Sequence, residues 1–127
     1  MKLKDIEVDF SFTDADDLER LENASKKVKE KAESGKKKEL SLSEAIREEC
    51  RIINHFFDEV FGEGISKRIF KGKNDLQEHM ELFMDIMNAK IEATKTTQNL
   101  YNNLEYKAKY MPNRETRRHN KYNKGRR

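Results

Sequence analysis

The chain has 127 residues, of which 40% are charged and only 35% are hydrophobic. Its 27 lysines and arginines against 24 aspartates and glutamates leave a formal net charge of +3. This length and composition predict one domain with a small core, which disfavours a large active-site cleft. No apolar run approaches the roughly 18 residues that cross a bilayer, and the first residues lack an export signal. We therefore expect no membrane contact. The single cysteine, Cys50, has no partner for an internal disulfide, which fits a cytoplasmic protein.

The charge is divided unevenly along the chain. Residues 113–127 carry seven basic residues against the single acid Glu115, a net charge of +6. Residues 4–22 carry eight acids against Lys4 and Arg20, a net charge of −6. The net charges of the two segments are opposite in sign and equal in magnitude. We therefore expect contacts between the basic segment of one subunit and the acidic segment of another.

The first predicted element is a β-strand over residues 4–12. Apolar and polar residues alternate there, which is typical of a strand with one buried face. The apolar positions are Ile6, Val8, Phe10 and Phe12. Because a lone strand is not stable, we expect it to pair with residues 38–42, with a second copy of the chain or with another protein.

Four helical segments follow the strand. The first is predicted from about Asp14 to Gly35, behind Thr13 and a group of acids that suit a helix N-terminus. The second, over residues 43–61, follows a capping box at Ser41-Leu-Ser-Glu44 and has the widest apolar stripe. A short helix is expected over residues 65–70. The longest helix is expected to begin at a second capping box, Asn74-Asp-Leu-Gln77, and to end before Pro112.

These elements predict a mainly α (α+β) fold. We expect an N-terminal strand, a small bundle of three to four helices and a long C-terminal helix in a single domain over residues 1–111. Residues 112–127 are predicted to be a flexible, disordered basic tail, because they lack the apolar residues that a core requires.

The titratable residues do not form a catalytic or metal-binding pattern. The histidines, His55, His79 and His119, lie on three separate segments. His55 and Glu59 are one helical turn apart, but two ligands fall short of a zinc site and a hydrogen bond within the helix explains them better. Cys50 lies on an apolar stripe, where a buried hydrophobe is the simpler interpretation. We therefore expect a non-enzyme without cofactor or metal.

A set of Phe and Met residues at helical spacing has two interpretations. Such residues usually form a core, but methionine also suits surfaces that bind varied apolar segments. The candidates for partner binding are Phe56, Phe57, Phe61, Phe70, Met80, Phe83, Met84 and Met87. Since residues 82–84 cannot all face one way on a helix, some apolar surface is expected to bind a partner. Self-association through the strand or the helix faces is our favoured hypothesis.

The basic tail is a second candidate binding segment. Its basic residues are Arg114, Arg117, Arg118, Lys121, Lys124, Arg126 and Arg127. It could contact phosphate or an acidic protein surface. Alternatively, it could have no dedicated partner and serve to keep the protein soluble. Nucleic-acid binding would depend on this tail, because the rest of the chain is negative and repels a duplex.

The order of these parts resembles small proteins of siphophages and prophages of Gram-positive bacteria, some of which are similar to tail assembly chaperones. The segments that carry the resemblance are IEVDFSF at 6–12, TDADDLER at 13–20, LSEAIREEC at 42–50, FFDEVFGEG at 56–64 and NRETRR at 113–118. The resemblance implies a helical, non-catalytic protein that binds the tape-measure protein and tail tube subunits during tail assembly. The alternatives are a small nucleic-acid-binding or regulatory phage protein and a structural virion component.

Overall fold

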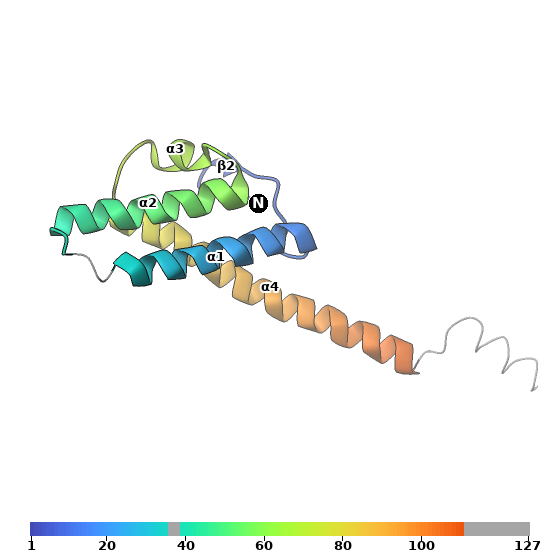
Figure 1. Cartoon of the computed structure of the whole chain (residues 1–127). Coiled ribbons are helices and arrows are strands. Elements are labelled where there is room, and N and C mark those ends of the chain that lie inside the picture. Colours follow the sequence, from blue (N-terminus) through green and yellow to red (C-terminus); the bar gives the residue numbers. More distant parts are fainter. Residues whose placement is uncertain (36–38, 111–127) are drawn as a thin grey trace, which may run out of the picture. The chain divides into compact units, whose positions relative to one another are not determined.

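A computed structural model describes residues 1–35 and 39–110, and it confirms the mainly α fold (Figure 1). The chain divides into two compact units, Met1–Lys90 and Ile91–Arg127, of which the second is described as far as Tyr110. The elements are β1 (Lys2–Leu3), β2 (Ile6–Glu7), α1 (Ala15–Gly35), α2 (Leu42–Phe61), α3 (Ile65–Phe70) and α4 (Leu76–Tyr110). Among the described residues, no helix combines the length and the apolarity needed to cross a membrane.

The N-terminal segment is a short hairpin, so the predicted extent of the strand over residues 4–12 was wrong, as was its pairing with the segment before α2. β1 and β2 pair antiparallel, with Lys2 opposite Glu7 and Leu3 opposite Ile6. The two-residue loop leaves Lys4 at φ 55°, as tight hairpin turns require at their first position. The Val8 N–H still donates to the Met1 carbonyl at 2.9 Å, but the chain leaves the hairpin after Val8, and the alternation there has another cause. Val8 and Phe10 are buried in the same apolar cluster as the helices, and the Phe10 ring lies 5.1 Å from the Phe61 ring of α2.

The helix boundaries agree with the predicted ones to within about a residue or two, but two of the caps use a different side chain. The Asp14 carboxylate, rather than Thr13, accepts a hydrogen bond from the Asp17 N–H at 3.0 Å. The Asp75 carboxylate, rather than Asn74, accepts from the Glu78 N–H at 2.9 Å. Ser41 caps α2 as predicted, by accepting from the Glu44 N–H at 3.2 Å. The predicted caps, Thr13 and Asn74, each lie one position before the residue that caps the helix. The sequence did not separate them because residues able to cap a helix are adjacent there.

The core of the first unit is built around α2. α1 packs against α2 and runs antiparallel to it, and α3 contacts α2 as well (Figure 1). The buried apolar cluster contains Leu3 from β1, Leu21 and Ala24 from α1, Ile53, Phe56, Phe57 and Val60 from α2, Ile65, Ile69 and Phe70 from α3, and Leu82 and Ile86 from α4. Every described element up to Lys90 except β2 therefore contributes a buried side chain.

A buried histidine connects α4 to α2 and α3. His79 is fully buried, with Nδ1 2.6 Å from the Asp75 carbonyl oxygen and Nε2 3.0 Å from Asn54 Oδ1. Its ring stacks on Phe70, with the ring centroids 3.7 Å apart and the planes inclined by 12°. The ring thus packs as an aromatic side chain, and each nitrogen lies within hydrogen-bond distance of an oxygen atom.

Replacing Phe57 by alanine should destabilise the protein by about 3–5 kcal/mol, because a fully buried ring leaves a cavity at the centre of the cluster. Leu42→Ala is the matched control, since the Leu42 side chain is 79% exposed and its loss should cost less than about 0.5 kcal/mol. Urea unfolding followed by circular dichroism at the helical band would measure both. Equal losses in the two variants would contradict this description of the core.

Candidate partner-binding surface

Part of the predicted Phe and Met set forms an exposed ridge on α4. Met80, Phe83, Met84 and Met87 are spaced i, i+3, i+4 and i+7, so they lie on one side of the helix. We call these four residues the methionine ridge. Met80 is 38% exposed and Met84 is 47% exposed, whereas Phe83 and Met87 are half-buried against the core. The ridge therefore offers two flexible apolar side chains on a fixed base.

The base of the methionine ridge is held by contacts to two other helices. The Phe83 ring meets the Phe56 ring edge to face, with the centroids 5.0 Å apart. Met87 Sδ lies 4.0 Å from Ser25 Oγ on α1. Because these residues are anchored, a partner that covers Met80 and Met84 would bury apolar area without reordering the helix.

The other Phe candidates belong to the core. Phe56, Phe57 and Phe70 are at most 2% exposed, so their side chains are not available to a partner in this fold. Phe61 is half-buried and stacks on Phe57, with a centroid distance of 5.8 Å. These four phenylalanines therefore pack in or against the core. Among the Phe and Met candidates, only the methionine ridge exposes side chains that a partner could cover.

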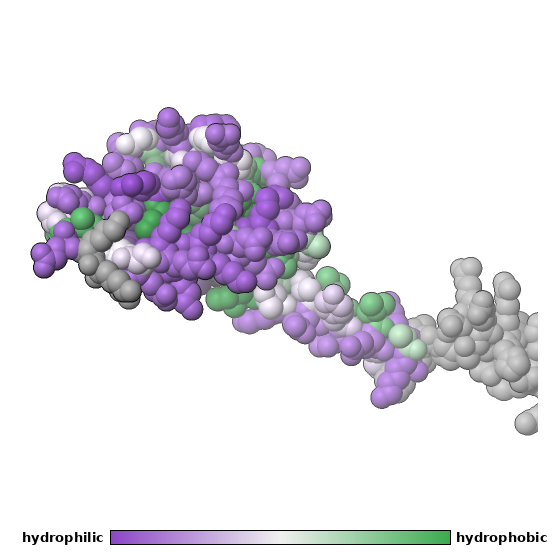
Figure 2. Space-filling view, in the orientation of Figure 1, coloured by the Kyte–Doolittle hydropathy of each residue, from purple (hydrophilic) through white to green (hydrophobic). Residues whose placement is uncertain are grey.

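The second unit contributes a separate apolar stripe, which sequence analysis did not include among the candidates. Leu100, Tyr101 and Leu104 on α4 are 56%, 60% and 65% exposed. Ala93 and Thr97 continue their spacing of three and four residues, and the Thr97 hydroxyl is turned inward to donate to the Ala93 carbonyl at 2.9 Å. Figure 2 shows hydrophobic patches recurring along α4, in contrast to the hydrophilic surface that dominates the visible face of the first unit.

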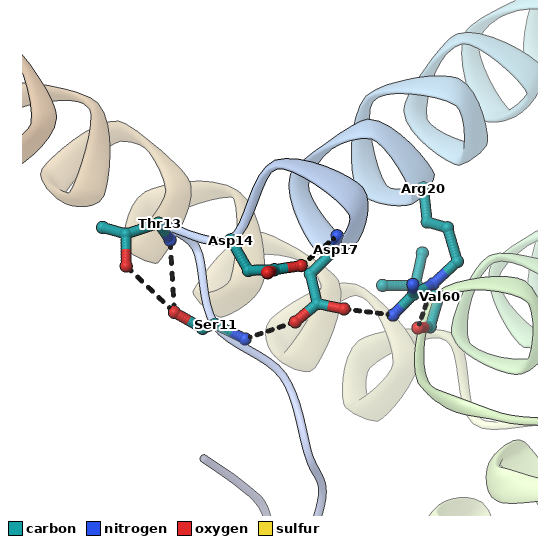
Figure 3. A network of polar contacts seen from close by, with 6 residues as sticks. All are labelled: Ser11, Thr13, Asp14, Asp17, Arg20 and Val60. Atoms are coloured by element: carbon teal, nitrogen blue, oxygen red, sulfur yellow. Dashed lines mark hydrogen bonds and ion pairs between the residues drawn. The ribbon is translucent and has the colours of Figure 1, made fainter.

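A polar network fixes the chain between the hairpin and α1 (Figure 3). The Ser11 N–H donates to the Asp17 carboxylate at 2.9 Å, and the Arg20 guanidinium pairs with the same carboxylate at 2.7 Å. Arg20 also donates from Nε to the Val60 carbonyl at 3.4 Å, near the end of α2. One carboxylate thereby links the incoming segment to α1 and, through Arg20, to α2.

The pKa shifts in the first unit have local causes. The hydrogen bond from the Ser11 N–H, followed by the one from Arg20, lowers the pKa of Asp17. The hydrogen bond from the Lys4 ammonium lowers the pKa of Glu78. Burial raises the pKa of the Cys50 thiol, and the carboxylates of Asp75 and Glu49 raise it further. A raised thiol pKa disfavours the thiolate, which is the reactive form of cysteine.

The described residues also show where the candidate metal ligands lie. Among residues 1–35 and 39–110, no three His, Cys, Asp or Glu side chains form a group that could hold a metal ion. His55 lines an open pocket of about 470 Å³ between the end of α1 and α2, beside the ion pair of Arg51 and Glu48. The seven basic candidates of the tail, Arg114 to Arg127, lie outside the described residues.

Two side chains with structural importance were not recognised from the sequence. His79 was treated as one of three scattered histidines, although its position four residues before Phe83 on an apolar stripe was a signal for burial. Lys4 was counted only as a charge. Its ammonium binds the Glu78 carboxylate and lies 5.4 Å from the Phe70 ring centroid, a contact that depends on the hairpin.

The fold places the chain among small, mainly α-helical proteins with a short N-terminal hairpin. The model of the DUF6673 family, described as a family of unknown function, matches residues 4–121. The chain therefore belongs to the DUF6673 family. No curated protein and no solved structure gives a significant match.

The lowered pKa of Asp17 predicts a pH-dependent contribution to stability. A carboxylate with a lowered folded-state pKa stabilises the protein above its ordinary pKa of about 3.9, and this contribution is lost as the pH falls through the lowered value. The Asp17→Asn variant should therefore be less stable than the wild type at about pH 7, and the difference should shrink toward about pH 3. Urea midpoints measured across this range would test it, with Asp16→Asn as the control on the same turn. A difference that does not change with pH would contradict the prediction.

Proposed function

We propose that this protein is a non-catalytic assembly chaperone that binds apolar, helical segments of partner proteins. The observation that carries the proposal is the methionine ridge, where Met80 and Met84 remain 38% and 47% exposed on a base that is packed into the core. Single exposed apolar residues are common on protein surfaces, but two adjacent methionines on one helix face suit an adaptable apolar contact.

The resemblance to siphophage tail assembly chaperones supplies the proposed clients. These are the tape-measure protein, which is long and helical, and the tail tube subunits. A helical client can place its own apolar stripe along the ridge, as amphipathic helices do in apolar grooves. The stripe of Leu100, Tyr101 and Leu104 in the second unit supports the same kind of contact. We place this activity in the cytoplasm of the host bacterium.

Co-expression with the candidate tape-measure protein is the direct test. We expect more of the client in the soluble fraction and co-purification of the two proteins. Met80→Ser/Met84→Ser should weaken binding by roughly 10- to 100-fold, because each partly exposed methionine contributes about 1 kcal/mol on burial. The same substitutions should leave the unfolding midpoint nearly unchanged, since both side chains are partly exposed in the free protein.

The control variant removes two exposed leucines outside α4. Leu40 and Leu42 are 37% and 79% exposed, and Leu40→Ser/Leu42→Ser should not affect client binding. Equal losses in both double variants would show that binding is not specific to the ridge. A client whose solubility does not respond to the wild-type protein would refute the proposed function.

A gel-shift titration separates this proposal from nucleic-acid binding through the tail. We expect only weak binding of DNA at physiological salt, because residues 4–22 carry a net charge of −6. Tight binding that disappears when residues 113–127 are removed would favour the regulatory alternative. Retention of the protein in purified virions would favour a structural component, since a chaperone leaves the mature tail.

A further inference from the structure

A basic pocket lies between α3 and the hairpin turn, on the first unit. It has a volume of about 310 Å³, and its lining includes Lys4, Arg68, Lys71 and Lys73. Buried Ile69 contributes to its apolar part. We call Arg68, Lys71 and Lys73 the α3 basic patch. Positive groups beside an apolar lining are suited to the carboxylates of a partner segment.

The cations of the α3 basic patch are not neutralised by the described part of the chain. Lys4 is paired with Glu78, so these two side chains neutralise each other and add no net charge to the pocket. None of the ion pairs among residues 1–35 and 39–110 involves Arg68, Lys71 or Lys73. Asp5 is the remaining carboxylate in the lining. Three cations against one carboxylate leave the pocket positive.

The backbone at this pocket is unusual. Lys4 at φ 55° and Lys71 at φ 54° are the two non-glycine residues with positive φ in the described part of the chain, and both line the pocket. Lysine is strained in this conformation, which glycine and asparagine adopt more easily. Both conformations are set by the backbone, since Lys4 stands in the hairpin turn and Lys71 is the C-cap of α3. Lysine at both positions places an ammonium group beside the pocket.

Carboxylates fit this pocket better than nucleic acid does. Base stacking needs an exposed aromatic ring, but Phe70, the ring in the lining, is only 2% exposed. Its neighbours are the His79 ring at a centroid distance of 3.7 Å and the Lys4 ammonium at 5.4 Å. A pocket of about 310 Å³ holds a few side chains rather than a duplex.

A complementary acidic row is present on α1 of the same chain. Asp16, Glu19 and Glu22 are exposed and follow each other at intervals of three residues, which places them along one side of the helix. None of them takes part in the ion pairs of the described residues. At a rise of 1.5 Å per residue the row is about 9 Å long, which matches the scale of a small pocket.

We propose that the acidic row of α1 from a second copy of this chain docks on the α3 basic patch. Three carboxylates then face three cations, and Lys71 acquires an acidic partner. The two surfaces differ, so a pair of copies joined by one such contact keeps one free acidic row and one free basic patch. Further copies can therefore add. This self-association needs no client and does not rest on the methionine ridge.

Sedimentation velocity of the full chain over a range of concentrations and salt tests the proposal. We expect the average mass to rise with concentration at low ionic strength, beyond that of a dimer, and to fall to that of a monomer at about 0.5 M salt. Arg68→Glu/Lys73→Glu and Asp16→Lys/Glu19→Lys should each weaken self-association by about tenfold or more. A mixture of the two variants should associate, since each retains a surface that complements the other.

Two further variants distinguish docking from general charge effects and from loss of fold. Lys29→Glu/Arg47→Glu changes the net charge by the same amount as Arg68→Glu/Lys73→Glu, but at exposed positions away from the pocket. This variant should associate as the wild type does. Lys71→Gly removes one ammonium and relieves the positive φ, so it should weaken association while the unfolding midpoint stays the same or rises.

The proposal is overturned if the wild type is a monomer at low salt, if the Lys29/Arg47 variant loses association as fully as the Arg68/Lys73 variant, or if the two charge-reversed variants fail to associate when mixed. Binding of a DNA oligonucleotide that depends on Arg68 and Lys73, without self-association, would overturn it in favour of a nucleic-acid site. Client binding by the methionine ridge is measured separately and can succeed or fail independently.

Discussion

The first unit depends on one helix being covered on two sides. Phe56 and Phe57 are consecutive on α2, so their side chains point about 100° apart around the helix axis. The Phe56 ring meets Phe83 of α4 at 5.0 Å, and the Phe57 ring meets Phe70 of α3 at 5.7 Å. A chain with few hydrophobic residues can therefore build one core, because each of these rings serves a different neighbour. The same arrangement determines which side of α4 remains outside the core.

The helices were predictable because their signals are local. Ser41 is followed three residues later by Glu44, and the apolar stripe of α2 follows at once, so both the start and the buried face of this helix could be read from the sequence. The hairpin could not be predicted in this way. Alternation over residues 4–12 is the same whether a segment pairs in a sheet or crosses a core, and only the tertiary fold shows that Val8 and Phe10 pack on helices.

The candidate binding surface was predictable only as a set of residue types. Spacing placed Met80 and Met84 on one side of a helix, but burial depends on which neighbours cover that side, and this information is not local. Phe56 and Phe57 belong to the same set of candidates, but neighbouring helices cover them, so they lie in the core. The α3 basic patch was missed because its cations follow one another along the chain without any spacing that predicts a pocket. The pocket exists only once the hairpin turn lies beside α3.

The distribution of aromatic residues gives the protein two optically distinct parts. It has no tryptophan, all seven phenylalanines lie between residues 10 and 83, and the four tyrosines lie between residues 101 and 122. Tyr101 and Tyr106 are 60% and 61% exposed on α4, while the first unit contains no tyrosine. Intrinsic tyrosine fluorescence therefore comes entirely from the second unit. A change in this emission on mixing with a tyrosine-free partner would assign contact to that unit without any label, whereas unfolding of the first unit has to be followed through its helices.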